Sequence, residues 1–123
     1  MKVSQKLQVA RDLLAQGWIR GGYVSRGIDG SFSYCARGAL DKAFLGRATS
    51  KAELRPDDEL RFAERLLAEA IHSPFLVGSG STAIRRAITT WNDSRAGANP
   101  RAHVVAAFDM AIAECKRLEA AAQ

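Results

Sequence analysis

The sequence predicts a mainly α-helical protein, a single compact domain of about five helices over residues 1–123, with either a short β-hairpin or an ordered loop between the first two. Three observations support this fold class. Apolar residues recur every three or four positions in several segments, which is the period of a helix that buries one face. Glycine, proline and serine gather mostly between those segments. The length is that of one domain with its own core.

The first helix is expected near the N-terminus, with Ser4 as its N-cap and Gly17 as its end. Its apolar face consists of Leu7, Ala10, Leu13 and Leu14. The next stretch, "GWIRGGYVSRGIDGSFS", is rich in glycine and serine and contains Asp29-Gly30, a dipeptide typical of hairpin turns. Tyr23-Val24 and Phe32 are therefore expected to form a short twisted hairpin, or the stretch is an ordered loop.

The second helix is expected within "SFSYCARGALDKAFLGR", capped by Ser31 or Ser33. Cys35, Gly38 and Ala39 follow helical spacing and form a face of small residues, which allows another helix to approach closely. Because Gly38 costs about 1 kcal/mol relative to alanine inside a helix, we expect it to have a packing role.

The segment "DDELRFAERLLAEAIH" is the clearest amphipathic helix, with Arg61 and Arg65 on its exposed face. Its buried stripe is expected to comprise Leu60, Ala63, Leu66, Leu67, Ala70 and Ile71. A short helix, "STAIRRAITTW", follows with Ser81 as its cap. The last helix is expected to begin at Asn99-Pro100, a good cap followed by proline in the first turn. Its core stripe is Val104, Phe108, Ala111, Cys115 and Leu118, widened by Val105 and Ile112.

The triplet Trp91-Asn92-Asp93 is interpreted as the end of the short helix. Trp91 lies in phase with Ile84 and Ile88, so we expect it to be mostly buried near Phe108. Asn92 tolerates the left-handed conformation that ends helices, and Asp93 suits an Asx turn. The alternative is that the triplet forms a recognition surface.

No catalytic set, metal site or cofactor site is predicted. Cys35 and Cys115 match no metal-ligand spacing and are expected to be free buried thiols. His72 and His103 are expected at the surface. Asp109, at the edge of the apolar stripe, is expected to be partly buried and to have a structural partner, either an arginine or a helix terminus. A carboxylate pair of Asp93 and Asp109 would suit acid–base chemistry, but no nucleophile and base accompany them.

One segment has features of a phosphate site. In "VGSGSTAIRRA", two glycines and two hydroxyls precede the positive end of a helix that carries two arginines, although the Gly-Lys-Ser/Thr ending of a Walker loop is missing. The candidate ligand-binding residues are Gly78, Gly80, Ser81, Thr82, Arg85 and Arg86. The structural alternative is a well-capped connection without a ligand.

Charge and hydropathy limit the class of protein. The net charge is +5, and the thirteen arginines and five lysines are spread along the chain, so non-specific affinity for anions is expected without specific nucleic-acid binding. No apolar run approaches the roughly 20 residues that span a bilayer, and the N-terminal stretch carries charges where a signal peptide would be apolar. A cytoplasmic, membrane-free protein is expected.

Four motifs together resemble a family of small uncharacterised proteins from actinobacteria and bacteriophages, a domain of unknown function. They are Gly17-Trp18, "YCARGAL" at residues 34–40, "TTWND" ending at Asp93, and "VVAAFDMAI" at residues 104–112. The structural signature comprises Trp18, Cys35, Gly38, Trp91, Asn92, Asp93, Phe108 and Asp109. The resemblance implies a compact helical domain in a phage-like context and supplies no catalytic residue.

Three functions are compatible with these features. The first is a non-enzymatic binding protein of phage or mobile-element type, acting on a host or viral macromolecule through a protein partner. The second is a binder of a phosphorylated small molecule or nucleic acid through Gly78 to Arg86. The third, an enzyme, requires Asp93, Asp109 or His103 to converge in a pocket. The sequence identifies neither the partner nor the oligomeric state.

Overall fold

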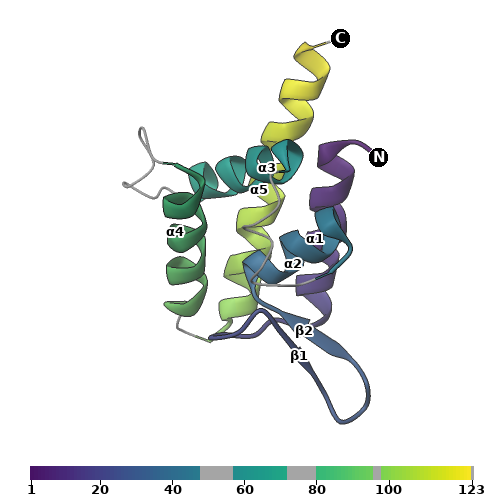
Figure 1. Ribbon diagram of the computed structural model, residues 1–123, viewed down its shortest axis with the longest axis vertical. Helices are drawn as coiled ribbons and strands as arrows, with labels where there is room; N and C mark the ends of the chain where they lie inside the picture. Colours follow the sequence, from purple (N-terminus) through teal and green to yellow (C-terminus); the bar gives the residue numbers. More distant parts are fainter. Residues whose placement is uncertain (48–56, 72–79, 96–97, 123) are drawn as a thin grey trace.

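The computed structural model describes residues 1–47, 57–71, 80–95 and 98–122, which form five α-helices and one antiparallel β-hairpin (Figure 1). The elements in chain order are α1 (Val3–Gln16), β1 (Val24–Arg26), β2 (Phe32–Tyr34), α2 (Ala36–Leu45), α3 (Asp58–Ala70), α4 (Ser81–Asp93) and α5 (Pro100–Ala121). The expected mainly α fold is confirmed, and the stretch between the first two helices is a hairpin rather than a loop.

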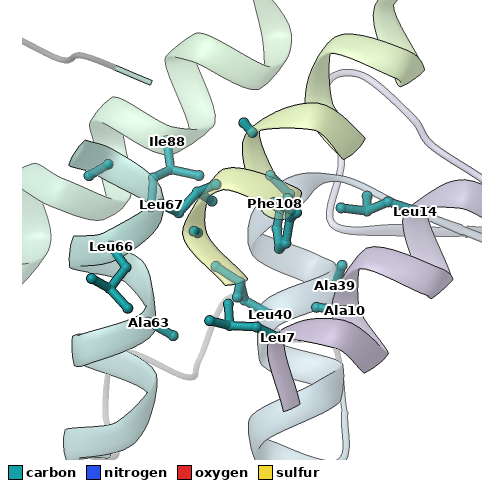
Figure 2. Packing of buried hydrophobic residues seen from close by; sticks show 14 of the residues in the cluster. Leu7, Ala10, Leu14, Ala39, Leu40, Ala63, Leu66, Leu67, Ile88 and Phe108 are labelled. Atoms are coloured by element: carbon teal, nitrogen blue, oxygen red, sulfur yellow. The ribbon is translucent and has the colours of Figure 1, made fainter. Parts of the chain in front are cut away.

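The long helix α5 organises the packing. It contacts α1 along one side and α3 along another, while α2 packs on α1 and α4 packs on α3 (Figure 1). Phe108 of α5 is fully buried, and Figure 2 shows its ring between Leu14 of α1 and Leu67 of α3. The predicted stripes of the third and last helices supply most of this core. They include Leu60, Ala63, Leu66, Leu67, Val104, Phe108, Ala111, Ile112 and Cys115.

Three predicted helix boundaries are confirmed. Gly17 is the C-cap of α1, where its N–H donates to the carbonyl of Leu13. Asn99 caps α5, accepting a hydrogen bond from the Ala102 N–H at 3.2 Å, and Pro100 follows in the first turn. The third helix begins after Asp57, whose carboxylate accepts from the Leu60 N–H at 2.8 Å.

Three predicted caps are wrong. Ser4 lies inside α1, because its backbone N–H and hydroxyl both donate to the carboxylate of Glu119 on α5. Ser31 and Ser33 do not cap α2, because β2 occupies residues 32–34 and the helix starts one residue after Cys35. The N-cap of α4 is Gly80 rather than Ser81, which is already the first helical residue.

The β-hairpin projects from the end of the molecule opposite the two termini (Figure 1). Ser25 pairs with Ser33 across the two strands. At the tip, the Asp29 carboxylate accepts from the N–H and hydroxyl of Ser31, and Gly30 adopts a positive φ of 85°. The Asp29-Gly30 dipeptide thus forms the turn that the sequence predicts. Among the helices that the structure describes, none has the length and apolar character required to traverse a bilayer.

Candidate functional site: the Asn92 network

Asn92 is the centre of a buried hydrogen-bond network. Its Oδ1 accepts from the indole N–H of Trp18 at 2.7 Å and from the backbone N–H of Ala36 at 3.0 Å. Its Nδ2 donates to the carbonyl of Ile19 at 3.2 Å and to Asp93 Oδ1 at 3.1 Å. An asparagine side chain has two acceptor and two donor positions, and all four are used here. We call this cluster of Trp18, Ile19, Ala36, Asn92 and Asp93 the Asn92 network.

Asp93 extends the network to the start of the hairpin. Its Oδ1 accepts from the Gly21 N–H at 2.9 Å. Nearby, the guanidinium of Arg20 lies 5.7 Å from the centre of the Trp18 ring and donates to the carbonyl of Arg95. The end of α4 therefore holds the chain that leaves α1 just before it enters β1.

These contacts correct the interpretation of the Trp91-Asn92-Asp93 triplet. Asn92 and Asp93 are helical residues, and α4 ends at Ser94 in a right-handed conformation with φ −90° and ψ −2°. Asn92 is therefore neither a left-handed stop nor part of a turn, and Asp93 forms no Asx turn. The physical reason is tertiary: a buried amide that finds four partners stays helical, whatever its intrinsic tendency to end helices.

Gly38 has the packing role that its cost within a helix predicts. A Cβ atom at this position would lie 1.9 Å from the carbonyl oxygen of Tyr23, so no other residue fits without moving the backbone. The same Tyr23 carbonyl accepts from the N–H of Cys35 at 3.2 Å. The Tyr23 hydroxyl accepts from Arg37 at 2.8 Å, and its ring lies 4.9 Å from that guanidinium. The base of the hairpin is thus fixed directly onto the first turn of α2.

Cys35 is a structural residue in this arrangement. Its sulfur accepts a hydrogen bond from the Gly38 N–H at 3.2 Å, which makes it the N-cap of α2. Burial raises the pKa of the thiol, so the reactive thiolate is disfavoured. Cys115 is also buried, and desolvation together with Glu119 raises its pKa to about 11. Both predicted free buried thiols are confirmed.

The remaining residues of the signature lie elsewhere. Trp91 is partly buried against the core, with the guanidinium of Arg95 at 5.0 Å from its ring centre. Asp109 pairs with Arg11 at 3.0 Å, so the expected arginine partner is confirmed. Its side chain is nevertheless 52% exposed, so the expected partial burial is wrong. Asp93 and Asp109 have different partners, and His103 is exposed as expected.

A second polar feature, which the sequence analysis missed, is a buried ion pair between α3 and α4. Arg85 Nε donates to both carboxylate oxygens of Glu64, at 3.2 and 3.1 Å, and the side chains are 5% and 1% exposed. Burial raises the pKa of Glu64, and the charge of Arg85 partly offsets this effect. Glu64 stands between Leu60 and Leu67 in the apolar stripe of α3, which was the available sequence signal.

The predicted phosphate segment stays a prediction. Gly78 lies outside the described residues, as does His72. Gly80, Thr82 and Arg86 are exposed, whereas Arg85 points into the protein and binds Glu64. Arg85 would have to leave this pair to contact a ligand. No group of three or more metal-ligating side chains occurs in residues 1–47, 57–71, 80–95 and 98–122.

Comparison with known families shows that residues 1–114 match the model of a family of unknown function, DUF6197. The chain belongs to this family. The curated proteins and the solved structures gave no significant match.

In this member of DUF6197, the matched region contains the whole Asn92 network and the hairpin. Three of the four motifs singled out from the sequence meet there: Trp18 and Asn92 share a hydrogen bond, and Cys35 and Gly38 form the adjoining turn of α2. The network itself has no vacant hydrogen-bond position on Asn92 for a ligand. Its evident effect is to set the position of the hairpin.

Proposed function

We propose that this chain is a non-enzymatic binding protein that engages a protein partner through its β1–β2 hairpin. The observation that carries the proposal is the apolar surface of the hairpin. Ile28, at the tip, is fully exposed, and Phe32 and Val24 on the strands are 49% and 40% exposed. Exposed apolar side chains gathered on one element are typical of interaction sites.

The outer edge of the hairpin supports a specific mode of binding. β2 has β1 on one side and Trp18 on the other, while β1 has no second neighbour within the described chain. The Tyr23 carbonyl and the Gly27 N–H both bond toward the β2 side. Because these groups alternate along a strand, the N–H and C=O groups of Val24 and Arg26 point outward. A partner that supplies an extended segment would pair with them.

The charges near the hairpin favour an acidic partner segment. Arg26 lies 5.8 Å from the Phe32 ring and is exposed, and Arg20 is exposed at the hairpin base. The carboxylate of Asp29, the acidic residue of the turn, already accepts a hydrogen bond from the Ser31 hydroxyl. We therefore expect the partner to contribute apolar side chains for Ile28 and Phe32 and a carboxylate for Arg26.

The resemblance to phage-related proteins points to a host or viral protein as this partner. A non-enzymatic role is further supported by the chemistry of the candidate residues. The Cys35 thiol has a raised pKa and caps a helix, and the carboxylates of Asp93 and Asp109 are held by separate partners. An enzyme would need such groups to converge on one substrate position.

The test compares the proteins retained by two matched variants from an extract of the native host. Ile28→Ser with Phe32→Ser removes apolar surface from the hairpin, and Val9→Ser with Met110→Ser removes exposed apolar surface from α1 and α5. We expect the hairpin variant to lose a protein that wild type and the control variant retain. Hydrogen exchange at Val24 and Arg26 should slow when that protein is bound. Equal retention by both variants, or unchanged exchange in β1, would contradict the proposal.

A further inference from the structure

A pocket of about 330 Å³ lies between α3 and α4, away from the hairpin. Arg61, Phe62, Glu64 and Arg65 of α3 line it together with Ile84 of α4. Its volume is at the lower end of the range of about 300–1,000 Å³ that is usual for small-molecule sites.

Arg61 and Arg65 are one helical turn apart and both are exposed. Neither makes a hydrogen bond or an ion pair with any residue in the described part of the chain. Glu64, the acidic residue of the pocket lining, is already paired with Arg85. The pocket therefore has an excess of positive charge and two guanidinium groups able to bind an anion. Guanidinium groups at this spacing suit a phosphate, which each can contact with two N–H groups.

The other lining residues indicate what the phosphate is attached to. Phe62 is 38% exposed, although it is a large aromatic residue, and it forms an apolar wall together with Ile84. An aromatic ring of a ligand would stack on Phe62 at little cost in hydrogen bonding.

We propose that this pocket binds a nucleoside monophosphate, with Arg61 and Arg65 on the phosphate and Phe62 against the base. Its cations, Arg61 and Arg65, come from α3 rather than from the predicted phosphate segment at Gly78 to Arg86, although Ile84 of that segment also lines the pocket. It is also independent of the hairpin, so the chain would carry a small-molecule site and a protein-binding element at different places.

The test is calorimetric titration of the full chain with the four common nucleoside monophosphates, the matching nucleosides, inorganic phosphate and a short single-stranded oligonucleotide. We expect at least one monophosphate to bind. Its nucleoside should bind at least about tenfold more weakly, because the charge-assisted hydrogen bonds to the phosphate are lost. Arg61→Gln and Arg65→Gln should each weaken binding about tenfold or more. Phe62→Ala should weaken the binding of the monophosphate without changing the affinity for inorganic phosphate.

Arg101→Gln is the matched control, since Arg101 is an exposed arginine on α5 that does not line the pocket. All these substitutions lie at exposed positions, and thermal unfolding would verify that each variant is folded. The proposal is overturned if no monophosphate binds. It is also overturned if Arg61→Gln and Arg65→Gln bind as well as Arg101→Gln, or if only the oligonucleotide binds.

Discussion

Helix α4 carries two buried polar side chains about two turns apart, Arg85 and Asn92, and they are satisfied in different ways. Arg85 is charged and depends on one partner, Glu64 of α3. Asn92 is neutral and is bonded to the α1–β1 connection, to α2 and to its own helix. The charged residue therefore joins two helices, whereas the neutral residue holds several chain segments that are distant in sequence.

The difference shows what each feature can do for function. In a buried ion pair between two helices, each charge offsets the free-energy cost of burying the other. Removing either residue leaves one buried charge without a partner. A fully bonded amide carries no net charge to compensate, and it fixes the direction of every group that it contacts. The Asn92 network is therefore suited to positioning the hairpin, and the Glu64–Arg85 pair is suited to forming the inner wall of a pocket.

The largest expected effect tests the ion pair. Arg85→Met should lower the free energy of unfolding by about 3–5 kcal/mol, because Glu64 is left buried without its partner. The double variant Glu64→Leu with Arg85→Met should be at least as stable as the wild type, since neither charge remains. Urea denaturation measures all three proteins. The neighbouring Arg86→Met, at an exposed position, should change stability by less than about 0.5 kcal/mol.

If the double variant were as unstable as Arg85→Met alone, the cost would come from packing rather than from the unpaired charge. The comparison with Asn92 would then lose its basis.

A somewhat smaller loss is expected for the Asn92 network. Asn92→Ala leaves the Trp18 indole N–H, the Ala36 N–H and the Ile19 carbonyl without their partner, and we expect a loss of about 3 kcal/mol. The free energy of unfolding is again the measurement, with the exposed Thr90→Ala as the control on the same helix. Hydrogen exchange in β1 and β2 should also accelerate in Asn92→Ala but not in Arg85→Met. Equal acceleration in both variants would show that the network does not specifically position the hairpin.

The smallest effect is a pH dependence that only the charged feature can show. The pKa of Glu64 is raised above its ordinary value of 4.5, so the folded protein holds this proton more tightly than the unfolded chain. The stability that Glu64 contributes is then fully present below pH 4.5 and is lost as the pH rises through the raised pKa. Relative to Glu64→Gln, the wild type should become less stable as the pH rises above 4.5 and through the raised pKa of Glu64.

Carboxylates with lowered pKa values, such as Asp29 and Glu119, act in the opposite direction in both proteins and cancel in the difference. An unfolding free energy difference that stays constant with pH, or that grows in favour of the wild type, would contradict the assignment. No such trend is expected between wild type and Asn92→Ala.

The same contrast explains how much the sequence could predict. Apolar periodicity predicts the stripes of α3 and α5, because it reflects the local 3.6-residue repeat. The turn at Asp29-Gly30 and the cap at Asn99 are also local, and both predictions are confirmed. Asn92 was interpreted from its local preferences as a helix stop, which is wrong because its partner Trp18 is 74 residues away. No local rule contains that contact.

For the Glu64–Arg85 pair, the sequence did contain an indication of a buried charge. Glu64 interrupts an apolar stripe at a position that must face the core, and a charge there requires a partner of opposite sign. Which of the thirteen arginines supplies it depends on how α3 and α4 cross, and the sequence does not specify that. The pocket beside the pair follows from the same crossing and could not be predicted either.

The bond between Ser4 and Glu119 has a practical consequence for handling the protein. It ties the start of α1 to the last turns of α5, so both ends of the chain emerge at one pole of the molecule (Figure 1). The hairpin lies at the other pole. An affinity tag or a surface linkage attached at either end would leave the hairpin facing the solution, and a label at Ile28 would report on contacts there without interference from the attachment.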